Sequence, residues 1–266
     1  MNILVTGSSS GIGKFLADSL AAKNHAVCRI ARSPQDGFSF PCDVADWSAL
    51  QKCSEMISVK WQSVDGLICC AGIQSPIGPA MEMEPAAWRS AIGVNLDGTF
   101  FSIRAFYPLL CQSQGRAKII CFSGGGSTSP RPNFAAYGVS KTGVVRLVET
   151  LAAEWQNQAL DINSIAPGAI FTRMTEQVLA GGAAAAGKKE FEQASKLPRD
   201  NIQALQKVLG LVDFLLSEKS DGISGRLISA PWDPWPQLSA HREELAGSDI
   251  YTLRRIVPED RGKKWS

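Results

Sequence analysis

The sequence has few of the residues that build metal and redox sites. Only two of its 266 residues are histidines, His25 and His241, and neither belongs to a group with metal-ligand spacing. The seven cysteines are an odd number and contain no C-x-x-C pair, so neither a disulfide framework nor a zinc site is expected. Reduced, mostly buried thiols are typical of cytosolic proteins, and we expect a cytoplasmic location.

Long apolar runs and a strong charge of one sign are also absent. No apolar run approaches the length of a membrane span. Met1 leads directly into an apolar strand, without the basic and apolar regions of a signal peptide. The formal net charge of +2 favours neither a nucleic acid nor a membrane as partner. The length suits a single α/β domain with a sizeable core.

What the sequence does contain is an alternation of apolar strands and helical segments. After a first strand that ends at Gly7, strands are expected at 26–31, 38–42, 66–71, 117–122, 161–165 and 225–229. Helices are expected between them at 14–22, 47–59, 86–110, 134–156 and 205–217. This alternation predicts a parallel sheet of about seven strands, with helices on both faces.

The first strand runs into a glycine-rich turn. Residues 6–13 read TGSSSGIG, with glycines at 7, 11 and 13, and helical apolar spacing follows from Lys14. A strand, a glycine turn and a helix in this order form a context for dinucleotide binding. Glycines let the backbone approach a pyrophosphate, and the helix N-terminus offers free N–H groups. A plain βα turn is the alternative.

The second motif is Tyr137-Gly-Val-Ser-Lys141. Residues four apart lie on one face of a helix. A lysine ammonium beside a phenol favours the phenolate and lowers a pKa that is normally about 10. Tyr137 is therefore a candidate proton donor and acceptor near neutral pH.

Taken in order, these motifs make the chain resemble the short-chain dehydrogenase/reductase family over residues 1 to about 230. The resemblance rests on seven features: TGSSSGIG at 6–13, Asp43-Val44, CCAG at 69–72, Asn95, the segment at Ser123, Tyr137 with Lys141, and PGAIFT at 167–172. It implies a Rossmann-type doubly wound sheet, a nicotinamide cofactor and hydride transfer between a carbonyl and an alcohol.

The resemblance also implies a role for each matching residue. The implied catalytic residues are Asn95, which holds a proton-relay water, Ser123, Tyr137 as general acid/base, and Lys141. The implied cofactor-binding residues are Gly7, Ser9, Ser10, Gly11, Ile12, Gly13, Asp43, Val44, Ala71, Gly72, Tyr137, Lys141, Pro167, Gly168, Ile170 and Thr172; Arg32 and Ser33 join them because of their own side chains rather than the resemblance. Within that set, Asp43 matches the adenine contact and Thr172 the residue near the carboxamide.

Two departures from the family pattern affect these roles. Cys69-Cys70 replaces an Asn-Asn pair, and a thiol is a weaker hydrogen-bonding group than an amide. The family's serine lies thirteen residues before the tyrosine, where this chain has Gly124. Ser123 is one residue earlier, and a one-residue slip on a regular strand reverses the side chain. The glycines that follow can turn Ser123 inward; Ser127 and Thr128, on an expected surface loop, are the other candidates.

The third departure concerns the adenosine end of the site. Only residues 33–37 separate the second and third strands, too few for the helix found there in many relatives. No acidic residue ends the second strand to accept a ribose 2′-hydroxyl. Arg32 and Ser33 can bind a 2′-phosphate instead, so NADP(H) is expected in preference to NAD(H). The alternative for Arg32 is a solvated loop charge.

The substrate side carries weaker signals. The family resemblance implies a mobile lid over the substrate at residues 171–200. Small residues at 179–187 have little to bury, so we expect this part of the lid to be poorly ordered without ligand. Four cations flank this stretch: Lys188, Lys189, Lys196 and Arg199. They could contact an anionic substrate, or they could form a solvated charged face.

The chain continues past the last expected strand, so we divide it into a catalytic domain, 1–230, and a C-terminal extension, 231–266. The extension contains Trp232, Trp235 and an expected short helix at 239–246 with Ser239 as N-cap. Its tryptophans and arginines suit a sugar or phosphate; coverage of a subunit interface is the alternative.

The sequence thus predicts an NADP(H)-dependent oxidoreductase acting on a keto or secondary hydroxyl group, with a phosphorylated or nucleotide-linked sugar as the candidate substrate. The expected partners are this small-molecule substrate and further copies of the chain, as a homodimer or homotetramer. The alternative is a cofactor-binding sensor or scaffold without turnover, which the displaced serine favours and the Asn95, Tyr137 and Lys141 set opposes.

Overall fold

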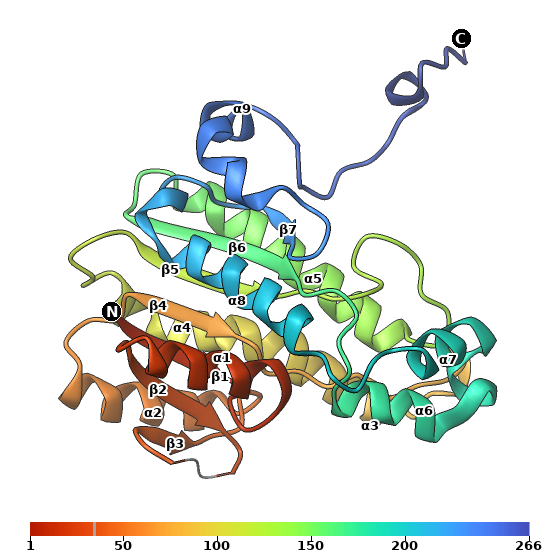
Figure 1. Cartoon of the computed structure of the whole chain (residues 1–266), viewed down its shortest axis with the longest axis horizontal. Coiled ribbons are helices and arrows are strands. Elements are labelled where there is room, and N and C mark those ends of the chain that lie inside the picture. Colours follow the sequence, from red (N-terminus) through yellow and green to blue (C-terminus); the bar gives the residue numbers. More distant parts are fainter. Residues whose placement is uncertain (34–35, 266) are drawn as a thin grey trace.

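The computed structural model describes residues 1–33 and 36–265. Its centre is a seven-stranded parallel sheet with the order β3-β2-β1-β4-β5-β6-β7 (Figure 1). The strands are β1 (Asn2–Thr6), β2 (Ala26–Ala31), β3 (Ser39–Pro41), β4 (Gly66–Cys69), β5 (Ala117–Phe122), β6 (Leu160–Ala166) and β7 (Leu227–Ser229). The predicted fold class is confirmed.

Helices cover both faces of the sheet because its central strands are buried on both sides. All six residues of β5 are buried, and so are four of the five in β1. The helices are α1 (Gly11–Ala22), α2 (Trp47–Lys60), α3 (Pro85–Ile92), α4 (Gly98–Leu110), α5 (Ala135–Glu154), α6 (Arg173–Ala186), α7 (Lys188–Ser195), α8 (Ile202–Leu216) and α9 (Arg242–Ala246). None of the helices in the described ranges is long and apolar enough to cross a membrane.

Alternate strand residues feed two separate cores. On one face Leu4, Leu67 and Ile119 pack with side chains of α2, α4 and α5. On the other face the next residues along the strands pack with α1 and α8. This period of two fixes the direction of each side chain at the strand ends, where the candidate site lies.

The helical stretch expected at 86–110 is present, with one irregularity. Between α3 and α4 the backbone forms a π-turn at Gly93–Asp97, and this turn holds the buried Asn95. A π-turn inside a helix is rare and often marks a functional site.

Two local expectations are wrong. Residues 179–186 continue α6 as helix, with one non-helical residue at Gly182, where the chain turns. The buried Val178 and Ala186, which pack with Phe134 and Tyr137, explain why a segment of small residues is held. Ser239 caps no helix: it lies inside the 3-10 helix Trp235–His241 and donates to the Lys219 carbonyl at 2.8 Å.

The C-terminal segment falls into two parts. Leu238 and Leu245 are buried in the core beside α8, and Trp235 packs on Phe214 with ring centroids 6.0 Å apart. A second tie to the body is the buried Arg226, whose guanidinium donates to the carbonyls of residues 245, 248 and 250. Beyond residue 253 the chain extends away from the body and ends far from the sheet (Figure 1).

Candidate active site

The candidate site lies at the carboxyl edge of the sheet, where the loops after β1, β4, β5 and β6 meet. The glycine turn after β1 contacts the loop after β4 closely. A Cβ on Gly7 would lie 2.6 Å from the backbone of Ala71, and Gly7 has a φ of +69°. A Cβ on Gly13 would lie 2.4 Å from the Gly7 carbonyl oxygen. Only glycine fits at these two positions.

The start of α1 suits a pyrophosphate. Ser10 is the N-cap residue and its side chain makes no capping hydrogen bond, so the first N–H groups of the helix retain their capacity for an anion. Ser9, Ser10 and Gly11 are exposed. Thr172 approaches from the loop after β6, with its Cγ2 3.7 Å from the Cβ position of Gly11. The glycine turn and the 167–172 segment therefore face the same space.

Residues predicted for the adenosine end are gathered beside β2 and β3. Arg32 and Ser33 are exposed directly after β2; the connection at 33–37 lies partly outside the described residues. The Asp43 carboxylate accepts from the Ala45 backbone N–H at 3.0 Å. Val44 is buried against the start of α4, where a Cβ on Gly98 would lie 2.6 Å from its Cγ2. Asp43 thus lies in a turn that Val44 anchors.

Pro167, Gly168 and Ile170 shape the loop that follows β6. Gly168 has a φ of +82°, and a Cβ there would lie 2.8 Å from Pro231. Ile170 is buried, and its carbonyl accepts from the Thr175 hydroxyl at 3.0 Å. The same hydroxyl accepts from the Thr172 N–H at 3.2 Å. These bonds fix the turn from which α6 begins.

Tyr137 and Lys141 lie one turn apart on α5, and both are buried, at 7% and 3% exposure. The Lys141 ammonium donates to the Phe122 carbonyl at the end of β5, at 2.8 Å. Its Nζ lies 5.9 Å from the centroid of the Tyr137 ring. A hydrogen bond to the strand end thus positions the lysine beside the tyrosine.

Burial dominates the ionisation of this pair. It raises the pKa of the Tyr137 phenol above its usual value of 10, and the guanidinium of Arg131 opposes that rise. It also lowers the pKa of the Lys141 ammonium. The direction expected from the Tyr137 and Lys141 pair, a lowered pKa of the phenol, is therefore not found: burial raises it instead.

Asn95 joins α5 to the loop after β4. Its amide Oδ1 accepts from the Ile73 N–H at 2.8 Å, and its Nδ2 donates to the Ile73 carbonyl at 2.9 Å and to the Ser140 hydroxyl at 3.0 Å. Ser140 in turn donates to the Tyr137 carbonyl at 2.7 Å. A Cβ on Gly72 would lie 3.1 Å from Oδ1 of Asn95 and 3.5 Å from Nζ of Lys141. The absence of a side chain at Gly72 thus leaves room between these two polar groups.

The tyrosine hydroxyl occupies the position of the missing serine side chain. A Cβ on Gly124 would lie 2.2 Å from the Tyr137 hydroxyl oxygen. Ser123 is 3% exposed, and its hydroxyl has no hydrogen-bond partner. A buried polar group without a partner is costly and calls for an explanation.

Ser127 differs from expectation. It is not on a surface loop but is buried, at 6% exposure. Its backbone carbonyl accepts from the Thr142 hydroxyl at 3.1 Å, which binds the loop to α5. The three consecutive glycines let the chain fold back onto the helix, as the φ of +96° at Gly126 shows.

Of the cysteines that replace the Asn-Asn pair, Cys69 is buried and Cys70 is half-buried. Burial raises the pKa of the Cys70 thiol to about 12, so the thiol is neutral. Its Sγ lies 3.4 Å from the Cβ position of Gly13. Cys70 therefore fills space under the glycine turn, while the Ala71 N–H beyond it donates to the Thr6 hydroxyl at 3.3 Å.

The loop between β5 and α5 is tied to the segment that covers the site. The Arg131 guanidinium pairs with Glu190 of α7 at 2.8 Å. The Gln74 amide oxygen faces this guanidinium and accepts from Nη1 and Nη2 of Arg131 at 2.8 and 3.1 Å. The Gln74 amide nitrogen donates to the Met174 carbonyl of α6 at 3.0 Å. The predicted lid is thus held against the loop by polar side chains.

The family model for short chain dehydrogenases matches residues 1–182, more than half of the chain. The chain belongs to the short-chain dehydrogenase family. It is 28% identical to a D-threitol dehydrogenase of Mycolicibacterium smegmatis, over 84% of this chain and 88% of that one. It is 30% identical to a 3-oxoacyl-[acyl-carrier-protein] reductase of Mycobacterium bovis, over 85% and 90%.

The structure agrees with the family. It matches an Escherichia coli protein solved in complex with NADPH, with a TM-score of 0.74, 25% identity, and coverage of 86% of this chain and 96% of that one. As a short-chain dehydrogenase, the chain is an oxidoreductase of a family that uses a nicotinamide cofactor. The start of α1 fits the pyrophosphate of such a cofactor, since Ser10 makes no side-chain capping bond and residues 9–11 are exposed.

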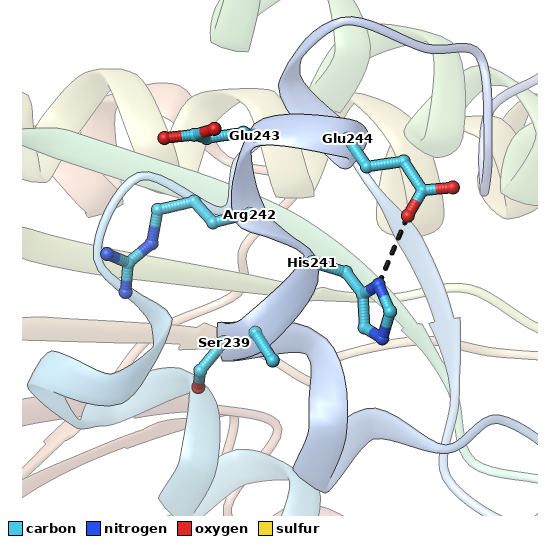
Figure 2. Close-up of a pocket in the computed structure, with 6 residues that line it drawn as sticks. Ser239, His241, Arg242, Glu243 and Glu244 are labelled. Atoms are coloured by element: carbon cyan, nitrogen blue, oxygen red, sulfur yellow. Dashed lines mark hydrogen bonds and ion pairs between the residues drawn. The ribbon is translucent and has the colours of Figure 1, made fainter.

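A surface hollow elsewhere takes no part in this short-chain dehydrogenase site. It has a volume of about 390 Å³ and is lined by six consecutive residues, 239–244 (Figure 2). Figure 2 shows His241 directed at Glu244, with Nδ1 of the imidazole 3.1 Å from Oε2 of the carboxylate, while Arg242 points to the other side. One short segment forms the whole hollow, and none of the predicted site residues lines it.

Three residues of the site were not predicted from the sequence. Ser140 lies inside the YxxxK motif, where its helical position beside Asn95 was not considered. Gln74 and Arg131 come from two different loops, and no spacing in the sequence connects them. Only the packing of α6 and α7 over the strand ends brings them together.

Proposed function

We propose that this short-chain dehydrogenase catalyses NADP(H)-dependent interconversion of a keto group and a secondary hydroxyl group. The observation that carries the proposal is the position of Tyr137: its hydroxyl faces the end of β5 at Gly124, and Lys141 lies beside its ring. The nicotinamide cofactor, when bound, supplies or accepts the hydride. Every proton and hydrogen bond comes from the chain itself.

Tyr137 acts as the general acid and base. In reduction its hydroxyl donates the proton to the substrate oxygen, and in oxidation the phenolate removes it. Lys141 holds its charge beside the phenol and offers its remaining N–H groups to the nicotinamide ribose. Asn95 holds the backbone of Ile73 in the loop after β4 and donates to Ser140, which is bound to the Tyr137 carbonyl. We propose that Asn95 also holds the proton-relay water.

Ser123 orients the substrate carbonyl. Its hydroxyl is buried at the strand end and lacks a partner, and a bound carbonyl oxygen supplies that partner. Gly124 has no side chain, so Ser123 is the hydroxyl-bearing residue closest to that position at the end of β5. A sensor without turnover is the second candidate, and the glycine at position 124 favours it.

The cofactor preference is for NADP(H). Arg32 and Ser33 are exposed directly after β2, where the adenosine ribose lies in this fold, and a guanidinium suits a 2′-phosphate. The similar Escherichia coli protein was solved with NADPH. This supports the same preference here.

The substrate is proposed to be a carbohydrate derivative with an anionic group. The cations Lys188, Lys189, Lys196 and Arg199 lie exposed on and after α7, and a phosphate or nucleotide-linked sugar matches their charge. The relative named D-threitol dehydrogenase points to a polyol-type substrate. We further propose a cytoplasmic homodimer or homotetramer, with 1–230 as catalytic domain and 231–266 as extension.

The decisive experiment measures oxidation of NADPH with a panel of keto sugars, sugar phosphates and nucleotide-linked keto sugars. Wild-type protein should turn over at least one of them, and Tyr137→Phe should lose turnover while keeping its affinity for NADPH, because only the transferable proton is removed. More than a few per cent of wild-type kcat in Tyr137→Phe would exclude this role. Cofactor binding without turnover of any carbonyl would favour the sensor.

A further inference from the structure

Tyr137 lies between two cations, and only one of them belongs to the YxxxK motif. The Arg131 guanidinium carbon is 5.9 Å from the centroid of the Tyr137 ring, the same distance as Nζ of Lys141. Arg131 comes from the β5–α5 loop, whereas Lys141 lies on α5 itself. The two charges therefore reach the phenol from different elements.

Arg131 is held on several sides. Its guanidinium lies over the Phe134 ring at 3.8 Å from the centroid and is paired with Glu190 at 2.8 Å. Gln74 accepts from both of its terminal nitrogens. Its side chain is 18% exposed. A charge fixed in this way in a region of low dielectric acts more strongly on its neighbour than a mobile surface charge.

The three glycines before it make room for this arrangement. A Cβ on Gly125 would lie 3.7 Å from Cδ and Nη1 of Arg131, and one on Gly126 would lie 3.3 Å from its Cβ. The arginine side chain thus runs along Gly125 and Gly126, next to Gly124, whose Cβ position faces the Tyr137 hydroxyl. Because residues 124–126 carry no side chains, the Arg131 guanidinium can lie beside the Tyr137 ring.

We propose that Arg131 is a positioning residue for Tyr137: held by Gln74 and Glu190, its guanidinium serves as a second fixed cation that favours the phenolate. The proposal rests on the proposed function, in which Tyr137 is the acid and base. Glu190 links this charge to α7, so the ionisation of Tyr137 depends on the covering segment being in place.

The charges around the phenol support this role. Burial raises the pKa of Tyr137, Arg131 lowers it, and the Cys70 thiol at the end of β4 raises it. Lys141, on the same helix, is the other cation that faces the ring. Glu190 is the carboxylate paired with Arg131. Removing the cation should therefore raise the pKa of Tyr137, and removing its carboxylate partner should lower it.

The test titrates the phenol directly in cofactor-free protein. The chain has only three tyrosines, so the ultraviolet absorbance of phenolate in Tyr137→Phe, subtracted from that of the parent, isolates Tyr137. In Arg131→Gln we expect the pKa of Tyr137 to rise by about one unit. In Glu190→Gln we expect it to fall by a fraction of a unit. Arg131→Lys, which keeps the charge, should titrate closer to wild type than Arg131→Gln.

The matched control is Arg146→Gln. Arg146 is on α5 and, like Arg131, is paired with a glutamate, Glu149, at 2.6 Å, but its side chain is 58% exposed. It should leave the titration of Tyr137 unchanged. The pH profile of kcat/KM for alcohol oxidation, which needs the phenolate, should move in the same directions as the titrations.

Opposite shifts in the two variants support the proposal, because general loosening of the site would move both in one direction. Shifts of the same sign, or no shift in Arg131→Gln, would overturn it. Activity of Tyr137→Phe separates the two hypotheses. A fully active Tyr137→Phe refutes the proposed function, whereas an inactive Tyr137→Phe without opposite titration shifts refutes only the role of Arg131.

Discussion

The two glycine-rich turns at the carboxyl edge of the sheet, 7–13 and 124–126, use the same residue for different purposes. In the first turn, missing side chains allow backbone to lie against backbone: Gly7 contacts Ala71 and Gly13 contacts the Gly7 carbonyl. In the second turn, the missing side chain of Gly124 leaves the space that the Tyr137 hydroxyl fills. In the proposed function, the first turn binds the cofactor, whereas the second makes room for the catalytic side chain of Tyr137.

The largest expected effect is on the first turn. Gly7→Ala places a Cβ 2.6 Å from the backbone of Ala71 at a φ of +69°. Left-handed strain and overpacking together should destabilise the fold by about 2–4 kcal/mol. Thermal unfolding measures this loss. Gly93→Ala is the matched control, because a Cβ there meets nothing within 4 Å, and it should leave stability unchanged or raise it.

Ser123→Ala tests what replaces the serine beside the second turn. Losing one positioned donor from the transition state typically lowers kcat by about 10²–10³. We expect a loss of that order, with Ser127→Ala within a few-fold of wild type, because Ser123 lies at the strand end and its hydroxyl lacks a partner. The reverse pattern in steady-state kinetics would assign the role to Ser127. Near-normal kcat in both would leave substrate orientation to Tyr137 and the pocket walls.

Gly124→Ala tests whether the second turn serves the tyrosine. The new methyl group would lie 2.2 Å from the Tyr137 hydroxyl oxygen and must displace it. A misplacement of about 1 Å costs up to about 10² in rate, so kcat should fall by about ten- to a hundredfold. Gly125→Ala, whose Cβ would meet only Arg131 at 3.7 Å, should remain near wild type. Equal activity of both variants contradicts this account of the turn.

The cofactor preference sharpens the account of the first turn. NADPH should bind at least tenfold more tightly than NADH, because charge-assisted hydrogen bonds to a 2′-phosphate contribute about 1.5–3 kcal/mol. Arg32→Ala should lose most of that preference while its Kd for NADH stays unchanged, which provides an internal control in fluorescence titrations. Equal Kd values for the two cofactors in wild type would refute the assignment of Arg32 and Ser33.

The smallest effect is expected at the C-terminus. Removing 254–266 should leave the Tm unchanged, since this segment extends away from the body (Figure 1). Removing 231–266 also takes away the buried Leu238 and Leu245 and the carbonyls that Arg226 binds, so the Tm should fall. We still expect the nucleotide site to form, because the sheet is complete at Ser229. Loss of NADPH binding in folded 1–230 protein would place the boundary near 253 instead.

The fold was predictable because its signals are local and repeated. Continuous apolar runs such as β5 alternate along the chain with helical segments such as the one that begins at Gly11, and this alternation predicts a parallel sheet. The boundaries of β5 agree residue by residue with expectation. The helix at residues 173–186 was missed because buried contacts with Phe134 and Tyr137, rather than its own sequence, hold it in place.

The sequence by itself determined the strand and helix order, the glycine turn and the pairing of Tyr137 with Lys141, because each depends on residues within a few positions of one another. Only the tertiary structure decided what surrounds the tyrosine. The hydroxyl against Gly124, the buried Ser127 and the fixed charge of Arg131 come from three points of one loop folded onto α5 and α7. Burial and charge at a phenol depend on distances in space, which spacing along a chain does not specify.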